Sequence, residues 1–159
     1  MTASATAAHQ VRPARQVLLE RLIDAGTWVT PDELTQGVST CPPAVEDALA
    51  DLVIEGKADY REHSGYRLAG SLVQRRAAKL MLQAKRKSQA PRRCGVASEV
   101  IGDEIHIGVA EERDDVADLG MVMYQLAVPL PADPTERLAT QQRAVQAVLD
   151  KFPQTEETT

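Results

Sequence analysis

The sequence predicts an α+β protein with a helical first part and a second part of about three strands and a terminal helix. Two β-rich stretches carry the strand prediction: residues 96–109, split by Gly102-Asp103 as in a hairpin, and residues 121–128, which indicate a buried strand. The helices follow from apolar side chains that recur three and four positions apart and give each helix one buried face. This spacing occurs in residues 15–24, 45–53, 72–84 and 138–152.

The N-terminal part begins with two helices. The first ends near Gly26, a residue that readily takes the left-handed conformation at a helix end. The second starts at Thr30-Pro31-Asp32-Glu33, where the threonine hydroxyl caps the helix and Glu33 reaches back to the amide of Thr30. Pro31 suits the first helical position because its missing donor costs nothing there.

A third helix and a hairpin follow. Gly37-Val38-Ser39 permits a turn, and the next helix, starting at Pro43 and ending at Gly56, carries a buried face. Two short strands then flank the turn His63-Ser64-Gly65. The buried face of the third helix is expected to comprise Val45, Ala48, Leu49, Leu52 and Val53.

This succession, over residues 15–69, resembles the winged helix-turn-helix family. The resemblance implies three helices and a β-hairpin wing, with the third helix facing the major groove of DNA. It covers about a third of the chain, and the turn before the third helix is about two residues longer than is usual for the family. Thr40, Cys41, Pro42 and Pro43 intervene between Ser39 and the first buried residue of the third helix.

The charge distribution divides the chain. Residues 1–93 hold 14 Lys and Arg against 10 Asp and Glu, whereas residues 94–159 hold 4 against 13. Residues 71–93 contain eight basic side chains and no acid. The expected organisation is a flexible arm (1–12), a winged-helix domain (13–70), a basic helix with a linker (71–93), an acidic α+β domain (94–153) and a disordered tail (154–159). A unit as small as the acidic domain tends to dock or dimerise, so a homodimer is expected.

The sequence indicates neither an enzyme nor a metal or cofactor site. His9, His63 and His106 lack the spacing of metal ligands, and the acidic run 111–118 lacks the alternating ligands and central glycine of a calcium loop. A solvated loop is expected for this run instead. No apolar run reaches the ~18 residues of a membrane span, and the first ten residues lack the apolar core of a signal peptide. A cytoplasmic protein is therefore expected.

The winged-helix resemblance and the basic segment together predict a DNA-binding transcriptional regulator as the leading function. Clustered Lys and Arg neutralise phosphates, which supplies most nonspecific affinity for DNA. The expected phosphate contacts are Arg61, His63 and Arg67 in the wing and Arg75, Arg76, Lys79, Lys85, Arg86 and Lys87 in the basic helix.

The third helix favours a different function. Its exposed face lacks the Arg, Lys, Asn and Gln side chains that read guanine or adenine, and its carboxylates repel a polyanion. Either the wing and the basic helix hold DNA, or the protein is an adaptor that binds another protein through this acidic face, or the acids only keep the surface soluble. The residues of the acidic face are Glu46, Asp47, Asp51 and Glu55.

Overall fold

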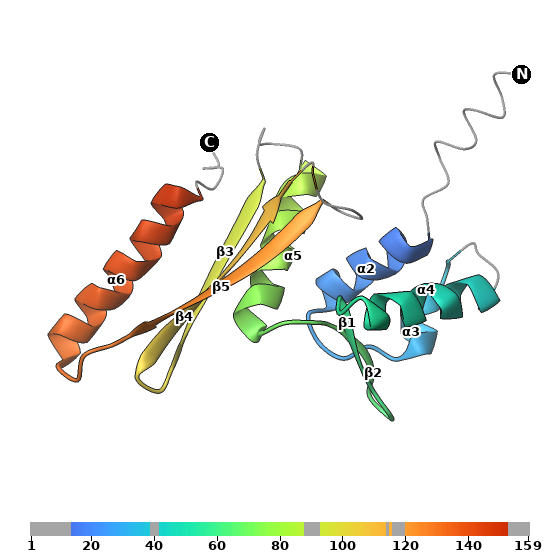
Figure 1. The fold of residues 1–159 in the computed structure, drawn as a ribbon, viewed down its shortest axis with the longest axis horizontal. Helices are drawn as coiled ribbons and strands as arrows, with labels where there is room; N and C mark the ends of the chain where they lie inside the picture. Colours follow the sequence, from blue (N-terminus) through green and yellow to red (C-terminus); the bar gives the residue numbers. More distant parts are fainter. Residues whose placement is uncertain (1–13, 39–41, 88–92, 114, 116–119, 153–159) are drawn as a thin grey trace, which may run out of the picture. The chain divides into compact units, whose positions relative to one another are not determined.

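The computed structural model describes residues 14–38, 42–87, 93–113, 115 and 120–152. It is an α+β structure with two small antiparallel sheets, of two and three strands (Figure 1). The chain divides into two compact units, residues 1–69 and residues 70–159. The expected arm, tail and most of the linker, as well as Ser39, Thr40 and Cys41, lie outside the described residues.

The described residues of the first unit form three helices followed by a hairpin. The hairpin is antiparallel, with Arg61 opposite Gly65 at its turn. Val29 adds an isolated bridge to Tyr66, with a backbone hydrogen bond of 2.8 Å in each direction. The elements are α2 (Ala14–Ala25), α3 (Pro31–Thr35), α4 (Pro42–Ile54), β1 (Ala58–Arg61) and β2 (Gly65–Leu68).

The predicted core of this unit is buried. The predicted capping box is also present at the start of α3, and each of its two hydrogen bonds is 3.4 Å long. Two details differ from the prediction: α4 begins at Pro42 rather than Pro43, and Val53 is only half-buried. The core is formed by Leu18, Leu22, Ile23, Leu34, Val45, Leu49 and Leu52.

In the described part of the second unit, the order is helix, three strands, helix. The strands form a meander in the spatial order β3-β4-β5, so β4 is central. The predicted hairpin is confirmed, because Ile101 pairs with Glu104 around Gly102, whose φ is 61°. The predicted start of the last helix is confirmed too, since the Asp133 carboxylate accepts from the Glu136 amide at 3.0 Å. The elements are α5 (Leu72–Lys87), β3 (Cys94–Ile101), β4 (Glu104–Glu112), β5 (Met121–Pro129) and α6 (Pro134–Lys151).

The two helices of this unit cover opposite faces of its sheet (Figure 1). The backbone of α5 approaches so closely that a Cβ built on Gly95 would lie 2.1 Å from the Ala77 carbonyl oxygen, and one on Gly108 would lie 2.4 Å from Val73. On the other face, α6 packs through Val148 against a cluster that includes Ile107.

Three parts of the second unit differ from the expectation. The basic helix, expected with its linker as a separate segment (71–93) between the two domains, packs on the sheet as α5 and belongs to this unit, and the two units divide at residues 69–70. Glu111 and Glu112, expected in a loop, are part of β4 because they pair with Val122 and Met121. The strand β5 was expected to be buried, but it lies at the sheet edge with one neighbouring strand, and residues 124–127 are exposed.

Candidate interaction surfaces

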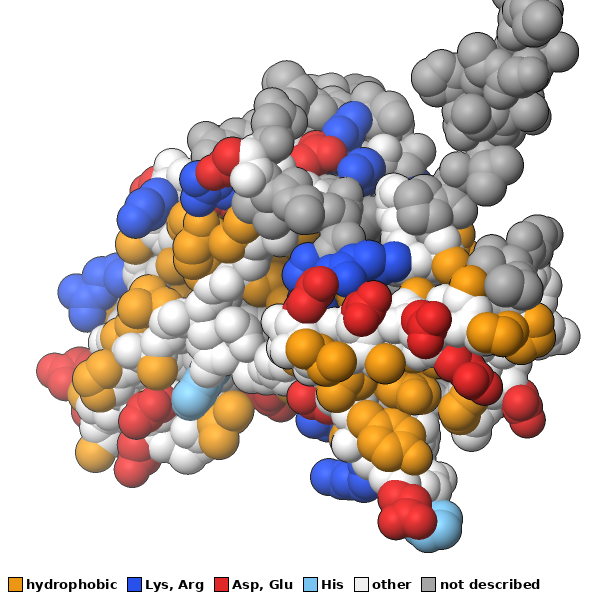
Figure 2. All heavy atoms as spheres, turned by 45° about the vertical axis from the view of Figure 1, so that its right-hand side comes forward, with side chains coloured by type: hydrophobic (Ala, Val, Ile, Leu, Met, Phe, Trp, Pro, Cys, Tyr) orange, Lys and Arg blue, Asp and Glu red, His pale blue; other side chains and the backbone are white. Residues whose placement is uncertain are grey.

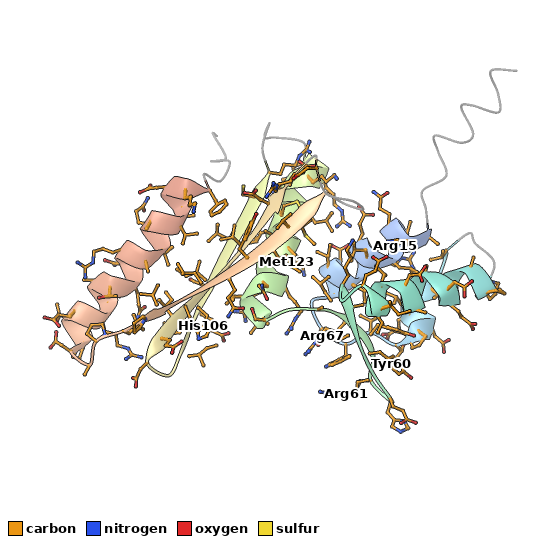
Figure 3. All side chains as sticks on the ribbon, viewed as in Figure 1. Arg15, Tyr60, Arg61, Arg67, His106 and Met123 are labelled. Atoms are coloured by element: carbon orange, nitrogen blue, oxygen red, sulfur yellow. The ribbon has the colours of Figure 1, made fainter. Side chains whose placement is uncertain are left out.

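The hairpin of the first unit holds its arginines against a tryptophan. The guanidinium carbons of Arg61 and Arg67 lie 4.7 Å and 4.4 Å from the centre of the Trp28 ring. Arg67 also pairs with Asp59, its cross-strand partner, at 3.2 Å. Figure 3 labels both arginines on this hairpin. Arg67 is therefore fixed by a cation–π contact and an ion pair, while Arg61 is exposed.

The tip of the hairpin carries His63. Its φ of 71° makes it the one described residue other than glycine with a positive φ. The imidazole is exposed and lies 3.9 Å from the Glu62 carboxylate. Of the three predicted wing contacts, Arg61 and His63 are thus exposed on the hairpin, whereas Arg67 supports it.

The exposed face of α4 is acidic, as predicted. Glu46, Asp47 and Asp51 are exposed. Glu55, one turn further on, accepts a hydrogen bond of 2.8 Å from Arg15 and lies 3.9 Å from Lys57. Figure 2 shows a row of acidic side chains beside apolar ones on this unit. The first three carboxylates therefore form the open part of the face.

Apolar side chains border these acids. Ile54, at the end of α4, is 81% exposed, and Tyr60 on β1 is 57% exposed. The rings of Tyr60 and Tyr66 are 5.0 Å apart. Burial, the nearby Tyr60 and the Glu46 carboxylate, in that order, raise the pKa of Tyr66 above its usual value.

A groove of about 290 Å³ lies between α3 and α4. Val45 and Leu49 contribute apolar atoms to it, and Asp32 and Glu46 contribute carboxylates. The groove therefore has an apolar floor and negative charge on both helices. Its remaining lining residues are Pro31, Thr35, Val38 and Pro42.

The basic residues of α5 lie in the second unit and divide into two groups. Arg76, Lys79 and Arg86 are exposed at helical spacing, on the side away from the sheet. Lys85 instead pairs with Glu112 of β4 at 3.3 Å, and Arg75 donates to the Gly70 carbonyl at 2.5 Å. Lys87 is also exposed, at the end of the helix.

The nine predicted DNA contacts are therefore divided between the units: Arg61, His63 and Arg67 belong to the first, and the six residues of α5 belong to the second. Two contributors were missed by sequence reasoning. No role was predicted for Trp28, whose ring forms the cation–π contacts with Arg61 and Arg67. Glu112, which also pairs with Arg93 at 2.6 Å, was assigned to a loop.

Among the described residues, no group of three or more His, Cys, Asp and Glu is placed to hold a metal ion. The helices in the described part of the chain are too short or too polar to cross a membrane. Compared with known proteins, the chain matches no family model and no curated protein.

Proposed function

We propose that residues 1–69 form a winged-helix module that binds another protein through the acidic face of α4. The observation that carries this proposal is the open carboxylate row of Glu46, Asp47 and Asp51 on the helix that a DNA-binding winged helix would direct into the major groove. Three exposed carboxylates there oppose a polyanion and favour a cationic partner.

The charge of the whole unit supports the same conclusion. Residues 1–69 contain six Lys and Arg against ten Asp and Glu, a net charge of −4. At least three of the basic residues already pair with acids of the same unit, since Arg67 pairs with Asp59, and both Arg15 and Lys57 pair with Glu55. Nonspecific binding to DNA depends on neutralising phosphates, and this unit has few cations to offer.

The apolar side chains next to the acids define the partner further. Ile54 and Tyr60 are large, exposed and in the same unit as the carboxylates. Protein interfaces use such side chains as buried anchors, surrounded by a polar rim. A partner that presents Lys or Arg around an apolar patch fits this surface, and a basic segment of another protein is the simplest example.

The test compares two triple variants of the full chain as baits in quantitative affinity purification from the native cell. Glu46→Gln, Asp47→Asn and Asp51→Asn neutralise the α4 face, whereas Glu62→Gln, Glu104→Gln and Asp150→Asn remove equal charge from exposed positions elsewhere. We expect one or more basic proteins to be lost with the first variant and retained with the second. Equal recovery with both variants would contradict the proposal.

The second candidate function is DNA binding through α5. Arg76, Lys79 and Arg86 form an exposed basic stripe, which is the specific observation that favours it. In a regulator of this kind, α5 supplies the phosphate contacts, and Arg61 and His63 of the wing add to them. Replacing the three stripe residues with Ala should then weaken binding to all sequences alike and flatten its salt dependence by up to about three units.

A further inference from the structure

The strand β5 is an edge strand without electrostatic protection. It spans nine residues and pairs only with β4, at the border of the three-stranded sheet. The sequence from Gly120 to Ala132 contains no charged residue, and no proline or glycine interrupts the strand before its last position, Pro129. Proteins usually protect such edges with charges, prolines or bulges, because the unpaired backbone groups recruit another strand.

The side chains of β5 are open on both faces of the sheet. Tyr124 and Leu126, on the face that α6 covers in part, are 37% and 48% exposed. Gln125 and Ala127, on the opposite face, are exposed as well. The middle of this strand is therefore only partly covered. The Tyr124 ring lies 6.0 Å from that of Phe152, and its hydroxyl accepts a hydrogen bond of 3.1 Å from Arg113, whereas Gln125, Leu126 and Ala127 are exposed.

We propose that β5 pairs antiparallel with β5 of a second copy of this chain, which joins the two sheets into one of six strands. A twofold axis perpendicular to the sheet keeps every side chain on its own face, so residues opposite each other must differ by an even number in sequence. The axis that overlaps the whole strand passes through Gln125. It places Tyr124 opposite Leu126, Met123 opposite Ala127 and Val122 opposite Val128.

The strand is complementary to itself in this register. Tyr124 and Leu126 form an aromatic–aliphatic cross-strand pair, and the symmetry repeats this pair on the other side of the axis. No like charges meet anywhere along the paired strands, because β5 has none. A copy of β5 therefore satisfies the backbone groups of the edge and covers its exposed apolar side chains at the same time.

The expected contact area is that of a small interface. Nine residues at about 3.4 Å each make an edge about 31 Å long, and one layer of side chains on each face makes the strip roughly 20 Å wide. This gives about 600 Å² per partner, somewhat less than the about 800 Å² of a standard specific interface. We therefore expect a reversible dimer with a Kd on the order of 1–100 µM.

Sedimentation velocity of the full chain across its concentration range tests the proposal. The wild-type chain should be largely dimeric at about 1 mM, roughly ten times the upper end of the expected Kd range. Leu126→Lys should remain folded by circular dichroism and be monomeric, because pairing would place two lysines about 8 Å apart on the same face of the joined sheet. The matched control is Ile101→Lys, which introduces the same charge at a 54% exposed position on β3 and should stay dimeric. A monomeric wild-type chain, or a dimer that only Ile101→Lys disrupts, would overturn the proposal.

Disulfide formation tests the register. In a Cys41→Ser background, Gln125→Cys should oxidise to a covalent dimer, because the axis places the residue opposite its own copy at a Cα separation of about 4.5–5.5 Å. Leu126→Cys alone should not, since its own copy lies about 8 Å away, beyond the reach of a disulfide. Cys94 can stay because it is buried. A covalent dimer of Leu126→Cys without one of Gln125→Cys would refute the register.

Discussion

Trp28 determines how the hairpin arginines are presented. Its ring lies under both Arg61 and Arg67, and Asp59 neutralises the second of them. A side chain held in this way supports the hairpin and is less available to a phosphate than its sequence position suggests. Residue type alone does not reveal these partners of Arg67, because they become its neighbours only when the hairpin folds.

Leu49 provides the residue-scale test of the first unit. Its side chain is 3% exposed, so Leu49→Ala leaves a cavity and should lower the free energy of unfolding by roughly 2–5 kcal/mol. Ile54→Ala on the same helix removes a side chain that is 81% exposed, and should change stability by less than about 0.5 kcal/mol. Urea denaturation measures both. Equal effects of the two substitutions would contradict the packing described for α4.

Tyr66 gives the first unit a predictable response to alkaline pH. Its folded-state pKa is raised above the usual 10.0, first by burial and then by Tyr60 and Glu46. Because the folded state favours the neutral phenol, the associated stability is fully present below pH 10.0 and is lost as the pH rises through the folded-state pKa. In a pH titration followed by absorbance at 295 nm, one tyrosine should therefore ionise at a higher pH than the others. This ionisation step should be absent in Tyr66→Phe. If the high-pH ionisation step remains in Tyr66→Phe, it belongs to another tyrosine and the prediction is wrong.

Some features of the helices and strands follow from a few neighbouring residues, whereas others depend on long-range packing. Thr30 and Asp133 cap their helices as predicted, because each cap involves only residues three positions away. The hairpin at Gly102 follows local turn chemistry in the same way. The edge position of β5 was not predictable, since an apolar run is compatible with either a central strand or an edge strand, and strand order depends on long-range pairing.

The packing of α5 on its sheet depends on two glycines. Gly108→Ala would place a Cβ 2.4 Å from the backbone of Val73 and should cost about 1–3 kcal/mol by displacing the helix. Hydrogen exchange should report faster opening along both α5 and β4. Gly102→Ala is the control. A Cβ at this position would have no atom within 4 Å, so the substitution adds only the backbone strain of a φ of 61° at the hairpin turn. Unchanged exchange in α5 of Gly108→Ala would show that the helix is not held this closely.

Over the whole molecule, the two units of the structure divide the charge differently from the basic first part and acidic second part of the sequence. With α5 assigned to the second unit, residues 70–159 carry twelve Lys and Arg against thirteen Asp and Glu, so they are nearly neutral, while residues 1–69 are acidic. The sequence could not reveal this, because the boundary follows from the contacts of α5 with β3 and β4. The proposed winged-helix module is thus the part of the chain with the excess of acids.

The most direct test is a fluorescence-anisotropy titration of random duplex DNA with the full chain at low and moderate salt. It asks whether the first unit is a DNA-binding or a protein-binding module. The wild-type chain is compared with Arg61→Ala and with Arg76→Ala, Lys79→Ala and Arg86→Ala combined. We predict that Arg61→Ala behaves as the wild type, and that any salt-sensitive binding is lost only in the α5 variant. Tight binding by the wild type that Arg61→Ala abolishes would show that the hairpin of the first unit holds DNA, and would contradict the account.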